Sequence, residues 1–187
     1  RFLDGSRVEV EGQNLNFTKA VICTGARASA PSIKGLDSVP YLTNETLFSL
    51  TELPRRFGVI GGGPMGAEMA QSFARFGSEV SLITSNRGLM PNEDREAVAI
   101  VRKHMEKDGV HILVGAHELD VSITQDGSIR LLHDQARNGY DIEVDQLLVA
   151  VGRTPNVEGL GLDKAGVEFS EKGVVINDNF QTTNRRI

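Results

Sequence analysis

Residues 57–77 read FGVIGGGPMGAEMAQSFARFG, and this stretch decides the fold. Its first four residues are a short apolar run, which is typical of a buried strand. Three glycines follow, and apolar residues then recur at helical spacing up to Gly77. The stretch therefore predicts a strand, a tight glycine turn and a helix, in that order. The helical apolar residues are Ala67, Ala70, Phe73 and Ala74.

The glycine turn has the spacing Gly61-x-Gly63-x-x-Gly66. In a dinucleotide-binding turn the first glycine permits the tight bend, the second lets a pyrophosphate approach the backbone, and the third lets helix and strand pack closely. The free N–H groups and the positive dipole end of the helix then face the phosphates. The alternative is a turn with only a structural role, which the flanking strands and helix make less favoured.

The segments after this turn extend the same pattern. Val80–Ile83 is a second apolar strand, Asp94 can cap a helix that ends at Gly109, and Val110–Val114 is a third strand. The order is therefore strand, helix, strand, helix, strand, as in a parallel α/β sheet. The buried stripe of the second helix is expected at Ala97, Val101 and Met105.

The helical period is lost beyond the third strand. The pairs Asp126-Gly127 and Asn138-Gly139 separate short apolar segments and favour hairpins. Leu147–Val151 is apolar on both faces, as expected inside a parallel sheet, and it ends at Gly152. The fold class expected is α/β: a Rossmann-like three-layer domain with a parallel sheet and an antiparallel three-stranded meander. The meander strands are expected at Leu119–Thr124, Ile129–His133 and Ile142–Val144.

Both ends of the chain carry short strand signals. Arg7–Glu11 alternates with period two, and a turn leads into an apolar run, Leu15–Thr24, which predicts a hairpin feeding a buried strand. Cys23 lies in that run, where a free cysteine is usually a small buried hydrophobe, so we expect it in the core. A linker punctuated by prolines follows, with a short helical turn expected in Glu45–Leu50. Gly173–Asn177 is expected to be a further strand.

The residues after the second strand bear on which nucleotide fits. An Asp or Glu there would accept a hydrogen bond from the ribose 2′-hydroxyl of NAD, but this chain has Thr84-Ser85-Asn86-Arg87. A 2′-phosphate could instead be met by the hydroxyls of Thr84 and Ser85 and by the guanidinium of Arg87. NADP is therefore favoured over NAD. The alternative for Arg87 is a solvated loop arginine.

Composition excludes several classes of function. With 40% hydrophobic and 24% charged residues the chain has a globular composition, and no apolar run approaches the roughly 18 residues of a membrane span. The net charge of −5 and scattered basic residues argue against nucleic acid as a partner. With a single cysteine and no leader-like start, a cytoplasmic location is expected. No metal site is expected, because the histidines have no ligand spacing. They are His104, His111, His117 and His133.

Four motifs together resemble the pyridine nucleotide-disulfide oxidoreductases, a family of flavoproteins. Ile22–Ala26 resembles the family's strand end beside FAD, and Gly61–Glu68 resembles its NAD(P) glycine motif. Val149–Asn156 is similar to its GRxPN signature, and Phe180–Thr183 to the strand that runs into the next FAD motif. Pro40–Thr43 and the missing acid after the second strand are most similar to the mercuric reductase branch, beside dihydrolipoamide dehydrogenase.

The family's domain order implies how this chain is divided. Its FAD-binding domain is interrupted by an inserted NAD(P)-binding domain, so residues 1–36 and 154–187 would be FAD-domain remnants around a nucleotide-binding domain at 37–153. Because the chain begins at Arg1 without methionine, we expect a piece of a longer protein. The redox cysteine pair and the dimerisation domain would lie outside it. We therefore expect no catalytic residue in this chain and a homodimer for the full-length protein.

The resemblance implies a relay in the full-length enzyme. NAD(P)H binds at the glycine motif, hydride passes to FAD, and electrons go on to a disulfide or a related acceptor. Glu68 would point toward the flavin and nicotinamide, or else only interact with the helix dipole. Pro64 stands where the glutathione reductase branch has a gating tyrosine. We expect the cofactor-binding residues to be Gly61, Gly63, Pro64, Met65, Gly66, Glu68, Thr84, Ser85, Arg87 and Gly152, with Thr24 and Gly25 beside FAD.

Two alternatives to this function stay open. The first is a non-enzymatic NAD(P)-sensing or interaction module, because a fold alone does not establish a function. The second is a relative of the monothiol NADH oxidases or of the ferredoxin reductases, which would share the same inserted domain. A redox cysteine pair next to a first FAD motif, encoded upstream of Arg1, would discriminate between them.

Overall fold

The computed structural model describes residues 1–134 and 139–187, and it describes His117 without its side chain. The expected Asn138-Gly139 turn therefore lies outside the described residues. Within the described ranges, no helix is long and apolar enough to cross a membrane.

The chain forms two compact units. The terminal unit consists of residues 1–27 and 153–187, and the central unit of residues 28–152. The sequence predicts the boundary between the first FAD-domain remnant and the nucleotide-binding domain after residue 36, whereas Ile33 and Leu36 are buried in the core of the central unit. Residues 28–36 therefore belong with the central unit.

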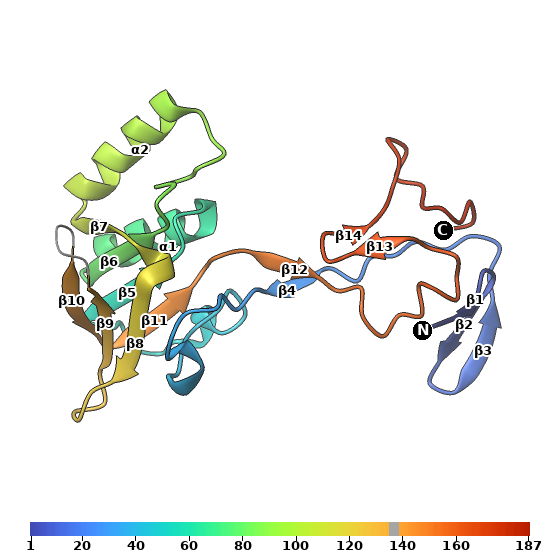
Figure 1. The fold of residues 1–187 in the computed structure, drawn as a ribbon, viewed down its shortest axis with the longest axis horizontal. Helices are drawn as coiled ribbons and strands as arrows, with labels where there is room; N and C mark the ends of the chain where they lie inside the picture. The colour runs from blue at the N-terminus through green and yellow to red at the C-terminus, as the bar shows by residue number, and fades with distance from the viewer. Residues whose placement is uncertain (135–138) are drawn as a thin grey trace. The chain divides into compact units, whose positions relative to one another are not determined.

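The centre of the central unit is a four-stranded parallel sheet in the order β11, β5, β6, β7 (Figure 1). This confirms the parallel strands predicted from the sequence. Successive side chains point to opposite faces, so Phe57 and Val59 pack on one side of the sheet and Ile60 on the other. The strands are β5 (Arg56–Ile60), β6 (Glu79–Thr84), β7 (Val110–Val114) and β11 (Gln146–Val149).

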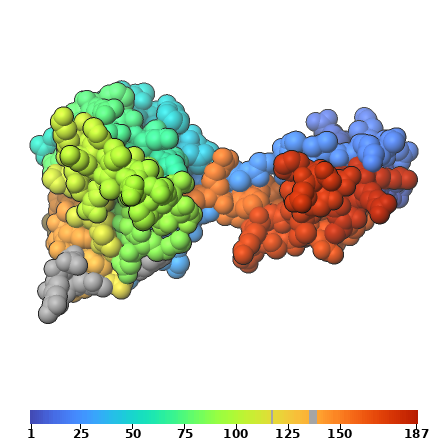
Figure 2. All heavy atoms as spheres, turned by 90° about the horizontal axis from the view of Figure 1, so that it is seen from above, coloured from blue at the N-terminus to red at the C-terminus, as the bar shows by residue number. Residues whose placement is uncertain are grey.

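Two helices cover the face that carries Phe57. They are α1 (Pro64–Phe76) and α2 (Arg95–Lys107). Asp94 caps α2 as predicted, since its Oδ1 accepts two first-turn N–H groups at 3.0 Å each. The predicted stripe of α2 is wrong by one position, because Ala97 is exposed while the larger Val98 is buried. The inner stripe consists of Val98, Val101 and Met105, and the other side of α2 lies on the surface (Figure 2).

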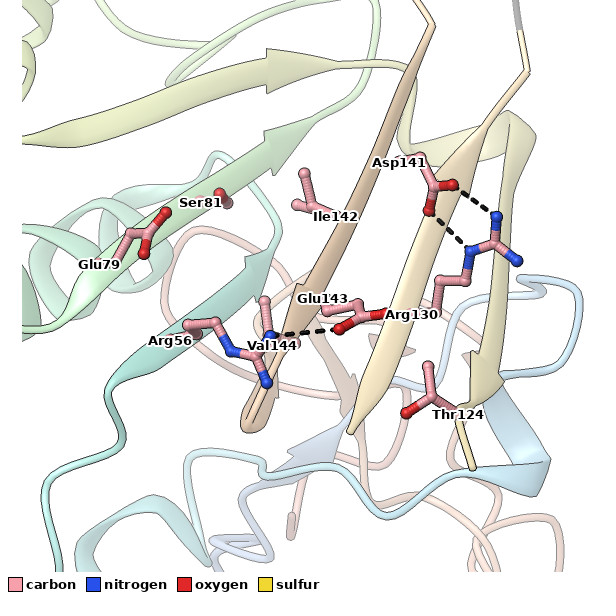
Figure 3. A pocket seen from close by; sticks show the side chains of 9 residues that line it. All are labelled: Arg56, Glu79, Ser81, Thr124, Arg130, Asp141, Ile142, Glu143 and Val144. Atoms are coloured by element: carbon pink, nitrogen blue, oxygen red, sulfur yellow. Dashed lines mark hydrogen bonds and ion pairs between the residues drawn. The ribbon is translucent and has the colours of Figure 1, made fainter. Parts of the chain in front are cut away.

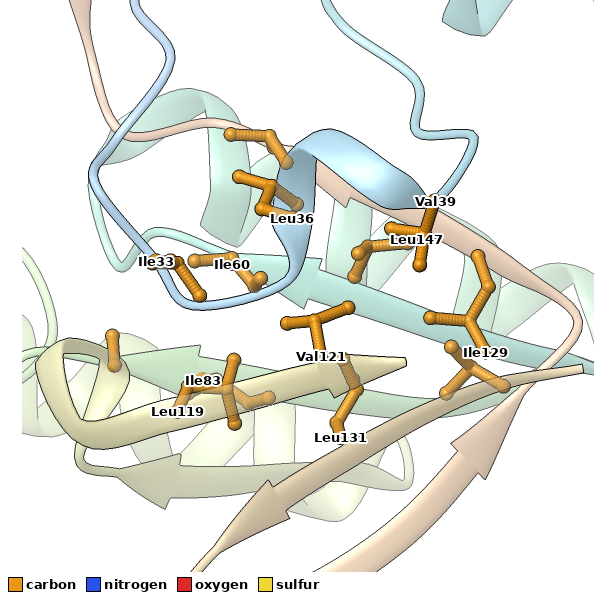
Figure 4. Packing of buried hydrophobic residues seen from close by; sticks show 13 residues of the cluster. Ile33, Leu36, Val39, Ile60, Ile83, Leu119, Val121, Ile129, Leu131 and Leu147 are labelled. Atoms are coloured by element: carbon orange, nitrogen blue, oxygen red, sulfur yellow. The ribbon is translucent and has the colours of Figure 1, made fainter. Parts of the chain in front are cut away.

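The opposite face of the parallel sheet is covered by the antiparallel meander, in the order β10, β9, β8. Its strands are β8 (Leu119–Ile123), β9 (Ile129–His133) and β10 (Tyr140–Val144). Apolar side chains of meander, sheet and linker form one buried cluster between the layers (Figure 4). Helices, parallel sheet and meander confirm the predicted three-layer α/β fold.

The linker that precedes β5 packs along the central unit. It contains the 3₁₀ helices η1 (Leu36–Ser38) and η2 (Leu47–Ser49), the second of which confirms the predicted helical turn. Isolated bridges join Lys34 to Asp120 and Leu42 to Leu148. The linker is therefore held to both sheets.

The terminal unit is built from short strands around a small core. The strands are β1 (Phe2–Asp4), β2 (Arg7–Val10), β3 (Gln13–Asn16), β4 (Ala26–Ala28), β12 (Arg153–Pro155), β13 (Phe169–Ser170) and β14 (Gly173–Val174). They form a β1-β2-β3 sheet and the pairs β12-β4 and β13-β14. The buried core residues are Phe2, Val157, Leu162, Ala165 and Val167.

Two predictions for the terminal unit are wrong. The expected buried strand Leu15–Thr24 is absent: β3 ends at Asn16, and no described strand pairs with residues 17–25. Val21 is 84% exposed, and Cys23 is exposed rather than in the core. An apolar run becomes a buried strand only where other strands pair with it and both of its faces are covered. Here Phe17, Ala20 and Ile22 pack partly against the small core of the terminal unit, whereas Val21 and Cys23 stay exposed. The strand expected at residues 173–177 is also shorter: Gly173 and Val174 pair with β13, and one further backbone bond runs from the Val175 N–H to the Glu168 carbonyl at 2.9 Å.

Candidate functional site

The glycine turn lies at the carboxyl end of β5, where Gly61 and Gly66 are required by packing. Gly61 has φ +123°, and its N–H donates to the Ile83 carbonyl at 2.9 Å. A Cβ on Gly61 would lie 2.3 Å from the Ala150 carbonyl oxygen, and one on Gly66 would lie 1.9 Å from the Gly61 carbonyl oxygen. No side chain fits at either position, so these two glycines bring β5, β11 and α1 into contact.

Gly63 differs from these two glycines, because its side-chain position faces open space. Apart from its chain neighbours, none of the described residues has an atom within 4 Å of a Cβ built there. Its backbone is extended (φ −73°, ψ 177°), so the conformation itself does not require glycine. Gly63 is the N-cap of α1, with Pro64 at the first helical position, and no described side chain caps this helix end. The first-turn N–H groups that follow, on Met65 and Gly66, therefore lack intrahelical partners.

Thr84 lies beneath the glycine turn. Its side chain is fully buried, and its methyl carbon is 2.6 Å from where a Cβ on Gly62 would be. Its hydroxyl lies 3.1 Å from the Ser85 carbonyl oxygen and 3.3 Å from that of Leu113. A hydroxyl has one proton to donate, so this proton is already used by the backbone.

The loop after β6 runs beside the glycine turn. The Met90 N–H donates to the Gly62 carbonyl at 2.7 Å, and the Arg87 N–H donates to Ser85 Oγ at 3.4 Å. The exposed Arg87 guanidinium donates to the Asn92 side chain at 3.0 Å. Of the polar groups expected to meet a 2′-phosphate, Ser85 and Arg87 are accessible here and Thr84 is not.

Arg95 fixes this loop, which the sequence did not indicate. Its guanidinium donates to the carbonyls of Leu89 (3.5 Å), Met90 and Glu93 (2.8 Å). Contacts from a side chain to loop carbonyls depend on the path of the loop, which has no periodic signal. The only hint in the sequence is an arginine directly after the N-cap Asp94.

The remaining predicted residues of this edge lie on α1 and after β11. Pro64 and Glu68 are exposed on the first turn of α1, and Met65 packs partly against the core below. Gly152 is exposed with φ +139°, and its carbonyl accepts from the Ser29 N–H at 3.1 Å. The carboxyl ends of parallel strands are where open α/β sheets bind ligands.

A second group of predicted residues lies within the terminal unit. The Thr24 hydroxyl donates to the Asn156 carbonyl at 2.8 Å, and the Asn156 side-chain amide donates back to the Thr24 carbonyl at 3.0 Å. The Asn156 N–H donates to the Gly25 carbonyl at 3.0 Å. The motifs Ile22–Ala26 and Val149–Asn156 are thus joined through Asn156, the last residue of the GRxPN signature, which was not among the expected cofactor-binding residues.

Arg27 and Glu158 continue this group. The guanidinium makes two parallel bonds of 3.0 Å to the carboxylate and a third of 3.0 Å to the Asn156 side chain. Hydrogen bonding from Arg27 lowers the pKa of Glu158 to about 2. The Glu158 carboxylate therefore stays charged in moderately acidic solution.

A separate cleft of about 580 Å³ opens at the other end of the parallel sheet (Figure 3). Arg56 and Glu79, which line it, are the first residues of β5 and β6, so the cleft lies away from the glycine turn. Its arginines are paired: Arg56 with Glu143 at 3.3 Å and Arg130 with Asp141 at 2.5 Å. Across the described residues, no group of three or more His, Cys, Asp or Glu side chains could hold a metal ion.

A parallel sheet with a glycine turn between its first strand and first helix defines a Rossmann-like α/β domain of the dinucleotide-binding type. The chain belongs to the pyridine nucleotide-disulphide oxidoreductase family, which matches residues 1–187. The family predicted from the four motifs is confirmed.

Known relatives agree with this assignment. The mercuric reductase of Bacillus cereus is 40% identical over 190 residues, which cover 100% of this chain and 30% of that protein. The dihydrolipoyl dehydrogenase of Thermus scotoductus is 37% identical over 188 residues, 98% of this chain and 40% of that protein. The HOCl-induced flavoprotein disulfide reductase RclA from Escherichia coli superposes with a TM-score of 0.87 at 30% identity, over 99% of this chain and 42% of that one. The chain thus spans less than half the length of each relative.

Proposed function

We propose that this chain is the NAD(P)H-binding part of an FAD-dependent oxidoreductase that passes hydride from NAD(P)H to FAD and electrons on to a disulfide or related acceptor. In this proposal the glycine turn holds the pyrophosphate of the nucleotide. The observation that carries it is the open space at Gly63, next to an uncapped helix end. A pyrophosphate fits such a place, because free N–H groups and the positive end of the helix dipole favour an anion there.

The residues of α1 have distinct parts in this proposal. Met65 and Gly66 donate their N–H groups to phosphate oxygens, while Pro64, which has no N–H, starts the helix without losing a donor. Gly61 and Gly66 keep the turn close to the sheet. Glu68, exposed on the same turn, borders the nicotinamide half.

The terminal unit would border FAD in the full-length protein. Gly25 has no described atom within 4 Å of its Cβ position apart from its chain neighbours, so the backbone there is open to a ligand. The bonds of Asn156 to Thr24 and Gly25 hold this backbone in place. When bound, the flavin accepts hydride and passes electrons on to the acceptor.

NADPH is the preferred nucleotide in this proposal. No carboxylate follows β6, and Thr84 is buried, so discrimination falls to Ser85 and Arg87. Asn92 holds one nitrogen of the Arg87 guanidinium, and no side-chain bond among the described residues uses the others, so they can make charge-assisted bonds to a 2′-phosphate.

The test is the variant Gly63→Ala, with Gly109→Ala as its control. The methyl group at residue 63 would occupy the space assigned to the pyrophosphate, so affinity for NADPH and NADH should fall together while the thermal midpoint stays close to that of the wild type. Gly109 ends α2 with φ +94° and open surroundings, so Gly109→Ala should lower the thermal midpoint and leave affinity unchanged. Calorimetric titration and thermal unfolding of each variant give both values. Unchanged affinity in folded Gly63→Ala would refute the proposal.

The alternative function, a non-enzymatic nucleotide sensor, can be distinguished from the proposed enzyme with the full-length protein. An enzyme of the proposed kind loses its yellow flavin colour when NADPH is added without oxygen. A protein that binds NADPH and keeps its flavin oxidised would support the sensor instead.

A further inference from the structure

His133 is a buried polar side chain to which the proposed function assigns no role. It is 3% exposed at the end of β9, and its neighbours across the meander are Leu119 on β8 and Tyr140 on β10. Among the described residues the other buried polar side chains are Ser78, Thr84 and Ser128. A buried imidazole costs free energy unless its surroundings compensate it, so its contacts are informative.

The His133 ring packs against the turn that follows β7. A Cβ on Gly115 would lie 2.5 Å from both Cε1 and Nε2 of the ring, so the glycine is what allows the ring to lie there. His133 Nδ1 is 3.4 Å from the Glu118 carbonyl oxygen. The Tyr140 ring also packs against the His133 ring, and the two ring centroids are 5.1 Å apart. One side chain thus touches both ends of the segment 115–118, which contains η3 (Ala116–Glu118).

This turn is joined to the edge that carries the glycine turn. The Gly115 N–H donates to the Thr84 carbonyl at 2.9 Å, and Thr84 lies directly under Gly62. A chain of contacts therefore runs from His133 through Gly115 and Thr84 to the glycine turn. All of these residues belong to the central unit.

The direction in which a nucleotide extends follows from the order of the strands. The pyrophosphate sits over β5, and in dinucleotide-binding sheets the ribose of the adenosine half is read at the end of the next strand, here β6. The strand beyond β6 is β7. The turn 115–118, at the end of β7, therefore borders the adenosine half and not the nicotinamide half.

We propose that His133 is a positioning residue for the adenosine moiety of the nucleotide, acting through the turn 115–118. The ring supports Gly115 from below and holds the Glu118 carbonyl, which fixes the backbone that the adenosine lies against. His133 itself does not touch the ligand. The proposal rests on the proposed function, because it needs a nucleotide at this edge of the sheet.

The test compares His133→Ala with Leu131→Ala. Leu131 lies two residues earlier on β9, is fully buried, and packs in the core beneath the sheet rather than on the turn. The probe is ADP-ribose, which has the adenosine and the pyrophosphate but no nicotinamide. His133→Ala should weaken ADP-ribose binding about fivefold to tenfold, whereas Leu131→Ala should lower the thermal midpoint and leave the affinity unchanged.

A conservative variant and a second site complete the experiment. His133→Phe keeps a flat ring against Gly115 but loses the Nδ1 contact with the Glu118 carbonyl, so it should restore part of the affinity, which a loss of general stability does not predict. Gly115→Ala places a methyl group into the His133 ring and should weaken ADP-ribose as much as His133→Ala does, so the proposal stays testable if His133→Ala does not fold. Wild-type affinity in His133→Ala or Gly115→Ala, or an equal loss in Leu131→Ala, would overturn the proposal. A wild-type chain that binds neither ADP-ribose nor NADPH would instead refute the proposed function.

Discussion

The glycine turn of the central unit and the Thr24–Asn156 group of the terminal unit carry equally recognisable motifs, yet they are built differently. The glycine turn comes from neighbouring residues, and steric contacts with β11 and α1 fix it. The Thr24 group joins residues 132 positions apart, through reciprocal hydrogen bonds on an exposed backbone. The three glycines are neighbours in the sequence, so their spacing can be recognised there, although the contacts of Gly61 reach Ala150. The Thr24–Asn156 pairing joins two distant segments, so it needs the surrounding fold.

The largest effect expected from this difference is on stability. Gly66→Ala places a methyl group 1.9 Å from the Gly61 carbonyl oxygen, so the free energy of unfolding should fall by about 3 kcal/mol. Gly25→Ala meets open space, and only its positive φ of +66° is strained, so the loss should be about 1 to 2 kcal/mol. Urea unfolding of both variants measures the two losses. Equal losses would show that the glycine turn is no more sterically fixed than the Thr24 group.

A smaller effect concerns nucleotide preference. Arg87→Ala should weaken NADPH binding about tenfold, equivalent to ~1.4 kcal/mol, and leave NADH binding nearly unchanged, because only NADPH has a 2′-phosphate. Arg102→Ala is the control, since it removes another exposed, paired arginine and changes the net charge equally. Parallel losses for both nucleotides, or a loss in the control, would contradict the role assigned to Arg87.

The smallest effect is the pH dependence of the Thr24 group. The pKa of Glu158 is about 2 in the folded chain against an ordinary 4.5, so its ion pair with Arg27 stabilises the terminal unit above pH 4.5 and this contribution is lost as the pH falls toward 2. In Arg27→Ala the pKa of Glu158 should return toward 4.5. Carboxyl NMR titration measures this pKa directly.

Arg1→Ala is the control for this titration, because Arg1 pairs with Glu9 elsewhere in the terminal unit. It should leave the Glu158 titration unchanged. A Glu158 pKa that stays low in Arg27→Ala would mean that backbone N–H groups, and not the guanidinium, hold the charge.

The fold of the central unit could be predicted from the sequence because its signals are local. The apolar runs of β5, β6 and β7, the cap at Asp94 and the Asp126-Gly127 turn each specify an element within a few residues. The one-residue error on α2 arose because Ala97 and Val98 both fit a helical spacing, and only packing against the sheet selects the larger side chain. The missing strand at Leu15–Thr24 is the opposite case, since its burial depends on a covering surface that apolar pattern alone does not supply.

The candidate site could be predicted in part for the same reason. Gly61, Gly63 and Gly66 follow from the spacing of one motif. In the structure, close contacts require glycine at positions 61 and 66, whereas the side-chain position of Gly63 faces open space. The buried position of Thr84, the Arg95 bonds to the loop and the His133 contact with Gly115 could not be predicted. Each depends on where a loop passes in space, and no residue spacing encodes that path.

Backbone amide NMR during titration with NADPH shows whether the nucleotide binds at the glycine turn. If the nucleotide binds there, we expect the largest chemical-shift changes at Gly63, Met65 and Gly66, smaller ones at Ser85 and Arg87, and none at the cleft around Arg56 and Arg130. Shifts centred on that cleft, with the amides of Gly63, Met65 and Gly66 unmoved, would contradict binding at the glycine turn.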